Sequence, residues 1–170
     1  IFNVAMATAT FSKTGGTGSP ATPWSATGLP AGININTANG QVTGTPTVTG
    51  IFMAVITYTD ANGCTDTQNA NFNVAPKLQN NTFADVVGNT QLVSNDHSIP
   101  TTPFTSDATN ILTNDSPGGI TITAVTNDAT TAGGSITIGT DGKFTYSPPN
   151  GSTAADTYVY TGTSNGVSAT

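Results

Sequence analysis

The residues best suited to chemistry in this 170-residue sequence are aspartates and asparagines grouped near turns. Asp60 and Asn62 lie in the segment Asp-Ala-Asn-Gly, and Asp66 follows shortly after it. Calcium takes carboxylate, amide and backbone carbonyl oxygens as ligands, so these three side chains form a candidate calcium site. The alternative interpretation is plain turn residues, because Asp and Asn side chains also bond their own backbone.

A second polar group lies in the other half of the sequence. Asn114 and Asp115 are adjacent, and Asp107 or Asp156 would complete their ligand set. Neither group has the ligand spacing of an EF-hand loop. Calcium is therefore the cofactor to test, with turn formation as the alternative for this group too.

Other reactive side chains are too few for a catalytic centre. His97 is the only histidine, and Cys64, the only cysteine, lies in the other half of the chain, so no His/Cys metal cluster can form. A nucleophilic triad would need His97 with distant partners, and no Gly-x-Ser-x-Gly motif supports one. Paired carboxylates of the glycosidase kind stay open, but no recognisable pocket accompanies them. We expect that the protein is not an enzyme.

Some side chains suggest contacts outside the chain. Trp24 is interpreted either as a sugar-stacking residue or as a core anchor of a sandwich, and loop residues near Trp24 or Tyr58 are candidates for contacting a glycan. Cys64 cannot form an internal disulfide, so it is either buried and inert or available for an intermolecular bond. Asn-x-Ser/Thr triplets begin at Asn80, Asn114 and Asn150, although chance produces such triplets readily in an Asn- and Thr-rich chain.

The composition excludes several classes of partner. Only 7% of the residues are charged, and three Lys against nine Asp leave a net charge of −6. Such a chain has no basic patch for phosphate backbones, so we expect no nucleic-acid binding. No apolar run approaches the roughly 20 residues of a membrane helix, and the start of the sequence does not have the basic-then-apolar pattern of a signal peptide, so we expect no membrane insertion in this segment. Scarce helix formers and abundant Thr, Asn and Gly favour strands and turns.

Turn residues and alternating apolar residues predict an all-β first half. Gly32, Asn39-Gly40 and Gly44-Thr45-Pro46 mark reversals around short strands at 33–36 and 41–43. The run 51–56 is apolar on both faces, as expected of a central strand inside a sandwich. Alternation over 69–74 predicts an exit strand with Asn69, Asn71 and Asn73 on its wet side.

These residues carry a resemblance to a known family. The series Gly-Leu-Pro-Ala-Gly, Asn-Gly and Gly-Thr-Pro, followed by 49–52 and 57–64, resembles the immunoglobulin-like repeat of bacterial surface proteins. The resemblance implies a spacer or adhesive module. Ile1-Phe2-Asn3-Val4-Ala5 echoes the exit strand at 71–75, so we infer a fragment of a longer repetitive or processed protein.

The second half predicts a separate set of strands after a polar linker at 76–81. Ile120, Ile122 and Ala124 alternate with Thr, and further strands are expected around 136–138, 144–146 and 158–160. Together with Leu-Thr-Asn-Asp and Gly-Thr-Asp-Gly-Lys-Phe-Thr-Tyr-Ser-Pro-Pro, this series resembles the cadherin-like tandem repeat of bacterial surface proteins. The chain departs from that family at 116–119, which lacks the usual carboxylates. The closing strand after Tyr160 is either cut short, so that a neighbouring chain would supply it, or lies outside the segment.

The sequence thus predicts an all-β chain of two tandem antiparallel immunoglobulin- or cadherin-like β-sandwiches, at 1–75 and 82–170. The expected function is an extracellular structural module of a bacterial surface filament, sheath or stalk, secreted or at the cell surface. Its partners would be copies of itself or neighbouring repeats. The alternatives are an adhesin or carbohydrate-binding spacer that contacts glycans or another cell surface, and a phage or virion surface decoration.

Overall fold

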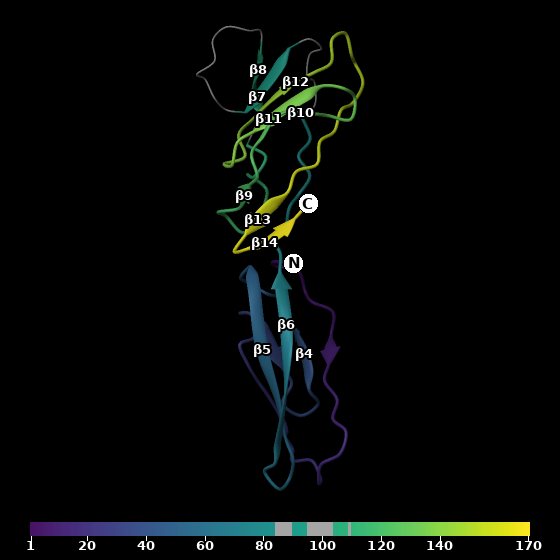
Figure 1. Cartoon of the computed structure of the whole chain (residues 1–170), viewed down its shortest axis with the longest axis vertical. Helices are drawn as coiled ribbons and strands as arrows, with labels where there is room; N and C mark the ends of the chain where they lie inside the picture. Colours follow the sequence, from purple (N-terminus) through teal and green to yellow (C-terminus); the bar gives the residue numbers. More distant parts are fainter. Residues whose placement is uncertain (84–89, 95–103, 109) are drawn as a thin grey trace. The chain divides into compact units, whose positions relative to one another are not determined.

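The computed structural model describes residues 1–83, 90–94, 104–108 and 110–170, with side chains at 104–108 left aside. Every regular element in these ranges is a β-strand, and no helix occurs there, which confirms the all-β prediction (Figure 1). The chain divides into two compact units. Unit 1 comprises Ile1–Lys77 with Ser164–Val167, and unit 2 comprises Leu78–Thr163 with Ser168–Thr170.

Unit 1 contains two three-stranded antiparallel sheets. One has the order β1-β4-β3 and the other β2-β5-β6. The strands are β1 (Ala9–Thr10), β2 (Trp24–Thr27), β3 (Ile33–Ile35), β4 (Gln41–Gly44), β5 (Gly50–Thr59) and β6 (Thr65–Val74). The short strands β3 and β4 lie where the turn residues predicted them, and β5 is the central strand of its sheet.

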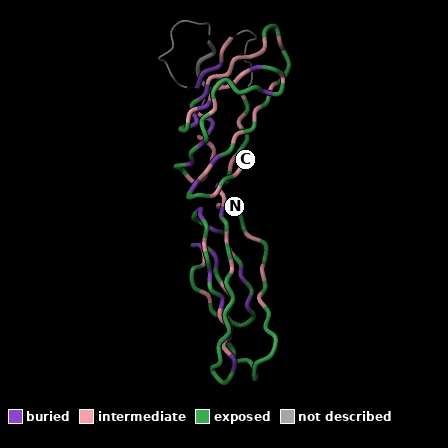
Figure 2. Tube along the Cα trace, in the orientation of Figure 1, coloured by how far each residue is buried: buried purple, intermediate pink, exposed green. Residues whose placement is uncertain are grey.

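The two faces of β5 have opposite environments. Ala54, Ile56 and Tyr58 are buried and pack with Trp24 in the core of unit 1. On the other face Ile51 and Met53 are 65% and 71% exposed, so the prediction of a strand enclosed on both faces was wrong. A sheet in a two-layer sandwich buries one face only, and the outer side chains of β5 have no layer above them. Along β5 buried residues alternate with exposed or half-buried ones, and Figure 2 shows buried, half-buried and exposed residues mixed within unit 1.

Glycines allow a close backbone approach at one end of the β3–β4 pair in unit 1. Gly32 has a φ of 86°, and a Cβ atom there would overlap the carbonyl oxygen of Thr45. Gly44 has the same constraint against the carbonyl of Gly32, and Thr45 N donates to Gly32 O at 3.1 Å. The Gly-Thr-Pro motif therefore lies at a close approach of two neighbouring backbones that a side chain would block.

Unit 2 is built around a five-stranded sheet of order β10-β11-β12-β7-β8. Its strands are β7 (Gln91–Ser94), β8 (Phe104–Ala108), β10 (Val125–Ala129), β11 (Ser135–Ile138) and β12 (Phe144–Ser147). The β7–β8 pair is parallel, whereas the sequence predicted only antiparallel pairing. A further sheet has the order β14-β13-β9, with β9 at Thr121–Ile122, β13 at Gly162–Ser164 and β14 at Val167–Ala169.

Two predicted strands of the second half differ in the structure. The alternation through Ala124 breaks because β9 ends at Ile122 and the chain joins another sheet as β10 at Val125. No strand forms at 158–160, although Tyr158 and Tyr160 still face the core of Leu92, Ile111, Ile122, Ile138 and Phe144. Their hydroxyls bond carboxylates, which tie this extended segment down without a backbone ladder.

Candidate functional site

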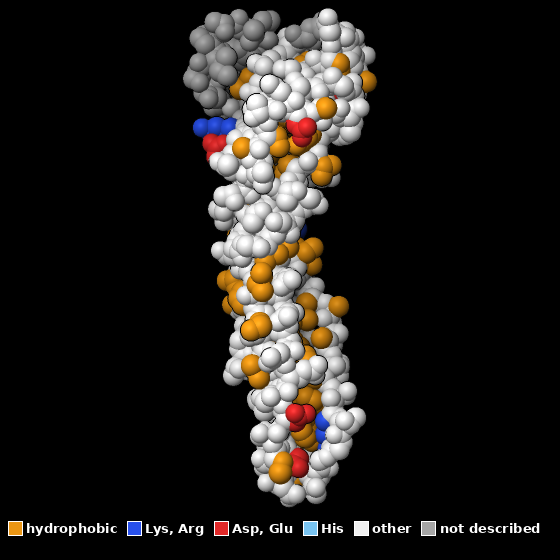
Figure 3. Space-filling view, viewed as in Figure 1, with side chains coloured by type: hydrophobic (Ala, Val, Ile, Leu, Met, Phe, Trp, Pro, Cys, Tyr) orange, Lys and Arg blue, Asp and Glu red, His pale blue; other side chains and the backbone are white. Residues whose placement is uncertain are grey.

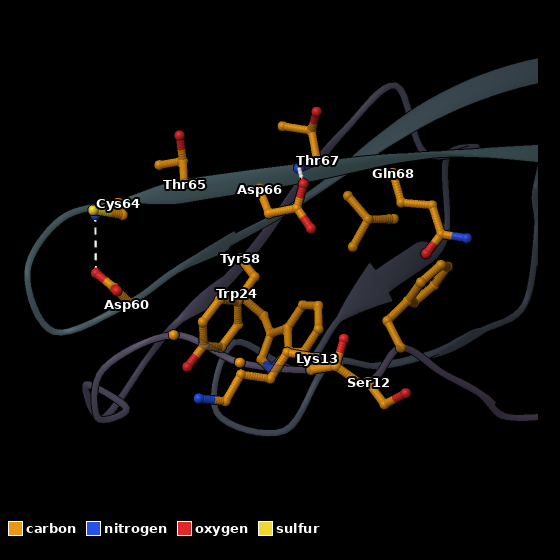
Figure 4. A pocket seen from close by; sticks show the side chains of 15 residues that line it. Ser12, Lys13, Trp24, Tyr58, Asp60, Cys64, Thr65, Asp66, Thr67 and Gln68 are labelled. Carbon is orange, nitrogen blue, oxygen red and sulfur yellow. Dashed lines mark hydrogen bonds between the residues drawn. The ribbon is translucent and has the colours of Figure 1, made fainter.

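A hollow of about 160 Å³ lies in unit 1 and brings the first candidate residues together. Strand β2 supplies Trp24, β5 supplies Tyr58, and β6 supplies Asp66 and Gln68. The loop before β2 closes the other side with Lys13 (Figure 4). The hollow therefore combines an aromatic floor with a polar rim.

The aromatic floor belongs to the core of unit 1. The Trp24 and Tyr58 rings meet edge to face, with centroids 5.0 Å apart, and the two side chains are 9% and 8% exposed. Gly40 packs against the Trp24 indole so closely that a Cβ atom would touch the ring. Of the two interpretations of Trp24, the structure places it as a core anchor, and its face is not open for stacking on a sugar.

Lys13 and Ser19 hold the Tyr58 phenol at the edge of the hollow. The Lys13 ammonium lies 4.9 Å from the Tyr58 ring centroid, and Lys13 Nζ donates to Gly18 O at 3.3 Å. The Ser19 and Tyr58 hydroxyls are 2.9 Å apart. The hydrogen bond with Ser19, followed by the nearby Lys13, holds the pKa of Tyr58 below its usual value.

Asp60 is a turn residue whose oxygens are occupied by amides. Its Oδ1 accepts the N–H groups of Asn62 and Cys64 at 2.9 Å, and its Oδ2 accepts Thr17 N–H at 3.2 Å. The amides of Thr17 and Cys64 hold the pKa of this carboxyl below its usual range despite the opposing effect of burial. Asn62 enters this arrangement through its backbone. Asp66 lies one strand further on, where Oδ1 accepts Thr67 N–H at 2.9 Å.

Asp115 and Asn114 form a polar network inside unit 2. Asp115 accepts Gln79 N–H at 2.7 Å and the Tyr160 hydroxyl at 2.9 Å. Burial, and then the Asp115 carboxylate, raise the pKa of Tyr160. Asn114 donates from Nδ2 to Asn80 O at 3.1 Å, while its Oδ1 is buried and has no hydrogen-bond partner among the described residues.

Asp156 has a different set of partners from Asp115. Its Oδ1 accepts from Thr131 Oγ1, Ala132 N and Thr157 N, and its Oδ2 accepts from Thr130 Oγ1 and Tyr146 Oη. Burial raises the pKa of Asp156, but the donors of Thr130 and Ala132, with those of Tyr146 and Thr131, outweigh it and bring the net pKa well below its usual range. The carboxylate is a structural hub that joins 130–132 to 156–157.

The candidate calcium ligands are thus engaged mainly by protein donors. In the described parts of the chain, no group of three or more His, Cys, Asp or Glu side chains could hold a metal ion. Amide and hydroxyl hydrogens point at the carboxylates of Asp60 and Asp156, as they do in turns and in hydrogen-bonded hubs. Calcium binding by these residues stays a prediction. The Asp107 side chain and His97 lie outside the described residues.

Sequence reasoning missed Lys13 and the tyrosine–carboxylate pairs. Lys13 lies in a Gly-rich loop, and only the fold brings it over Tyr58. Tyr158 donates to Asp128 Oδ2 at 2.7 Å from 30 residues away, and no periodicity reports such a pairing.

Cys64 is exposed, so of its two interpretations the structure supports an available thiol over a buried one.

The comparisons with known proteins agree with the sandwich of unit 1. Residues 2–75 match the family described as "Putative Ig domain". The match supports an immunoglobulin-like repeat over these residues. Such domains are typically not enzymes and are commonly found in extracellular or surface proteins, where they act as structural modules. The match does not extend to the second half, whose cadherin-like resemblance stays a prediction.

No curated protein matches the chain. Among the described residues, no helix has the length and apolar character needed to cross a membrane.

Proposed function

We propose that the chain is an extracellular structural module, a repeat or subunit of a surface filament, sheath or stalk, whose copies associate through their β-sandwiches. The outer face of the β2-β5-β6 sheet carries this proposal. Ile51, Met53 and Val55 are exposed there, and their partners across β6 are Asn73, Asn71 and Asn69. Such a face, apolar along one strand and uncharged along the next, packs against a like face with no charge repulsion.

The surface composition supports the same function. Charged side chains are sparse on the face seen in Figure 3, and hydrophobic side chains appear over β5. Neutral Thr, Asn and Ser hydrate a surface while permitting close contact between neighbours. The immunoglobulin-like repeat supplies a rigid unit that a longer protein can use many times.

Negative-stain electron microscopy of the native, unfractionated material tests this function. Regular fibres with a repeat that matches one or two sandwiches are the expected result. Dispersed rods or beads would contradict self-assembly and favour an adhesive spacer. Analytical ultracentrifugation of the 170-residue chain over a wide concentration range is the matching solution measurement, and a chain that is monomeric throughout also counts against the proposal.

The hollow beside Tyr58 favours a second candidate function, that of a glycan-binding spacer. Lys13, Asp66 and Gln68 place donors and acceptors around it, as sugar hydroxyls require. A glycan array tests it, with Gln68→Ala expected to lose binding and Asn71→Ala, on the outer face of β6, expected to retain it. An array without any signal would remove this candidate.

A further inference from the structure

Strand β6 is an unusually long open edge. It spans Thr65–Val74 and lies at one end of the β2-β5-β6 order. The other described edge strands have at most five residues, as in β8 and β10. Short edges are one of the devices by which proteins avoid unwanted strand pairing, and β6 lacks it.

The hydrogen-bond pattern identifies which backbone groups of β6 face outward. Asp60 N donates to Cys64 O at 2.9 Å, which makes this pair a hydrogen-bonded one next to the β5–β6 ladder. Hydrogen-bonded and non-hydrogen-bonded pairs alternate in antiparallel sheets, so Tyr58–Asp66 is hydrogen-bonded and Thr57–Thr67 is not. The N–H and C=O groups that point away from β5 are those of Thr65, Thr67, Asn69, Asn71 and Asn73.

These outward groups are open to a partner strand. Ala75, the next residue in the same series, accepts Phe2 N–H at 2.9 Å from the chain's own N-terminal segment. In the described residues, no backbone hydrogen bond from another segment reaches the five outward positions, and all five are exposed. The Thr67 N–H alone is met locally, by the Asp66 carboxylate. The Ala75 carbonyl thus already accepts a main-chain hydrogen bond at the end of this edge, whereas the outward backbone groups of 65–73 have no main-chain partner from another described segment.

Side chains do not protect this edge. Lys and Pro are the usual guards of edge strands, and β6 contains neither. Asp66 is its only charged residue and lies near one end. The long central part of the edge therefore has neither a charged side chain nor a proline to block a second strand.

We propose that β6 pairs antiparallel with β6 of a second copy of this chain, with Asn69 opposite Asn69, so that two three-stranded sheets join into one. This inference rests on the proposed function and adds the β6 edge to the outer face of the sheet as a surface of association. In this register Thr67 lies opposite Asn71 and Thr65 opposite Asn73. All outward backbone groups of both strands then find partners, provided that the Asp66 carboxylate releases Thr67 N–H.

A second copy fits this edge better than an unrelated strand because the edge is self-complementary. The side chains that meet on the outer face are Asn or Thr throughout, and both can donate and accept hydrogen bonds across strands. Asp66 lies opposite Phe72 rather than opposite its counterpart, so the two carboxylates stay apart. The Phe2–Ala75 hydrogen bond limits the pairing to residues before Ala75.

A single strand pair is a small interface. It joins two strand edges rather than two faces, and it therefore falls in the class of weak contacts below roughly 1,200 Å² of total buried surface. We expect association of isolated chains to be weak and dependent on concentration. In a tandem array several such pairs act together, and avidity can exceed the single affinity by about 10²- to 10⁴-fold.

Cysteine cross-linking of the whole 170-residue chain tests the pairing and its register. In a Cys64→Ser background, Asn69→Cys places two thiols directly opposite each other, at a Cα separation of about 5.5 Å that a disulfide can span. Asn71→Cys is the matched control, because in this register its counterpart lies opposite Thr67. The expected result under mild oxidation is a covalent dimer at least tenfold faster for Asn69→Cys than for Asn71→Cys. Equal rates, no dimer, or faster coupling of Asn71→Cys would overturn the proposed pairing.

A second variant tests the edge without a cysteine. Asn71→Pro removes an outward N–H that the β5–β6 ladder does not use, so the sandwich should fold while self-association in ultracentrifugation falls at least tenfold. Asn71→Ala keeps the N–H and should associate as the parent does. If Asn71→Pro is folded by circular dichroism and associates unchanged, β6 is not the interface, although the proposed function survives through another surface. If the parent chain never associates, both proposals fail.

Discussion

The Tyr146 hydroxyl donates to the Asp156 carboxylate at 2.9 Å, and this bond joins the central region of the unit 2 sheet to the segment that follows β12. The same carboxylate receives hydroxyl and amide donors from Thr130, Thr131 and Ala132. The Asp156 side chain thus connects its own segment with 130–132 and with strand β12, and no local sequence pattern predicts these contacts.

Replacement of this carboxylate should destabilise unit 2. Asp156→Asn removes the charge that several donors share, and hydrogen bonds to charged groups contribute about 1.5–3 kcal/mol, so we expect a loss of about 2–3 kcal/mol in the free energy of unfolding. Asp141→Asn is the control, because its partner Lys143 lies 3.7 Å away and both side chains are more than half exposed. The control should change stability by less than about 0.5 kcal/mol in urea unfolding. Equal effects of both variants would contradict the hub.

The same carboxylates should make the fold acid-sensitive. The pKa values of Asp60 and Asp156 lie below the unfolded value, which is about 3.9 for Asp. A depressed folded pKa stabilises the protein fully above the unfolded pKa and loses this stabilisation as pH falls through the folded pKa. We expect thermal stability to decline from about pH 4 downward, and Asp156→Asn should flatten that decline. A parent and a variant with parallel acid profiles would show that Asp156 does not contribute.

The four tyrosines should ionise in two groups. Ser19 and Lys13 lower the pKa of Tyr58, whereas burial and Asp156 raise the pKa of Tyr146 to about 12. The Asp128 hydrogen bond, with burial, raises the pKa of Tyr158 to about 12, and the pKa of Tyr160 is also raised. Absorbance at the tyrosinate band should therefore show one residue that ionises below the other three. Tyr58→Phe should remove that early step alone, and its persistence in Tyr58→Phe would refute the assignment.

For Tyr146 and Tyr158 the sign of the stability change is opposite to that of the aspartates. Their raised folded pKa values give stability that is complete below the unfolded value of about 10 and is lost as pH rises through about 12. Unfolding at alkaline pH should therefore accompany the late tyrosine ionisations rather than the early one.

The close approach of the Gly32 backbone to the Thr45 carbonyl predicts a contrast between two alanine substitutions. Gly32 and Gly63 have nearly the same positive φ, 86° and 83°, but only Gly32 lies against a neighbouring carbonyl. Gly63→Ala should cost about 1–2 kcal/mol for the left-handed backbone alone. Gly32→Ala carries the same cost and a backbone clash, so we expect a loss above about 3 kcal/mol in urea unfolding. Similar losses would mean that the close approach has no energetic importance.

The two faces of β5 predict a second contrast. Ile56 is 2% exposed, so Ile56→Ala should cost about 2–5 kcal/mol through lost burial and a residual cavity. Met53 is 71% exposed, so Met53→Thr should stay within about 0.5 kcal/mol of the parent. Thermal denaturation at low protein concentration measures both without interference from association. A large loss for Met53→Thr would indicate that another layer covers this face.

Much of unit 1 could be predicted from local signals. Positive-φ glycines near Gly32, Gly40 and Gly44 mark turns, because only glycine enters that region without cost, and alternation at period two gives the inner side of β5 and β6. The Gly-Thr-Pro series also carries the immunoglobulin-like resemblance that the family match supports. These features depend on neighbours in sequence, and a sequence displays them directly.

The remaining features depend on contacts between distant segments. Sequence alone could not show that Thr17 N–H reaches the Asp60 carboxylate or that the Tyr146 hydroxyl reaches Asp156, because no local pattern reports which donors meet a carboxylate. The sequence predicted that both faces of β5 are enclosed, because Ile51 and Met53 are as apolar as Ile56. Only the number of packed layers decides which face of the strand is covered. Local periodicity determined which residues share a face, whereas tertiary packing decided which face is buried, which hydroxyl meets which carboxylate and which strand edge is left open.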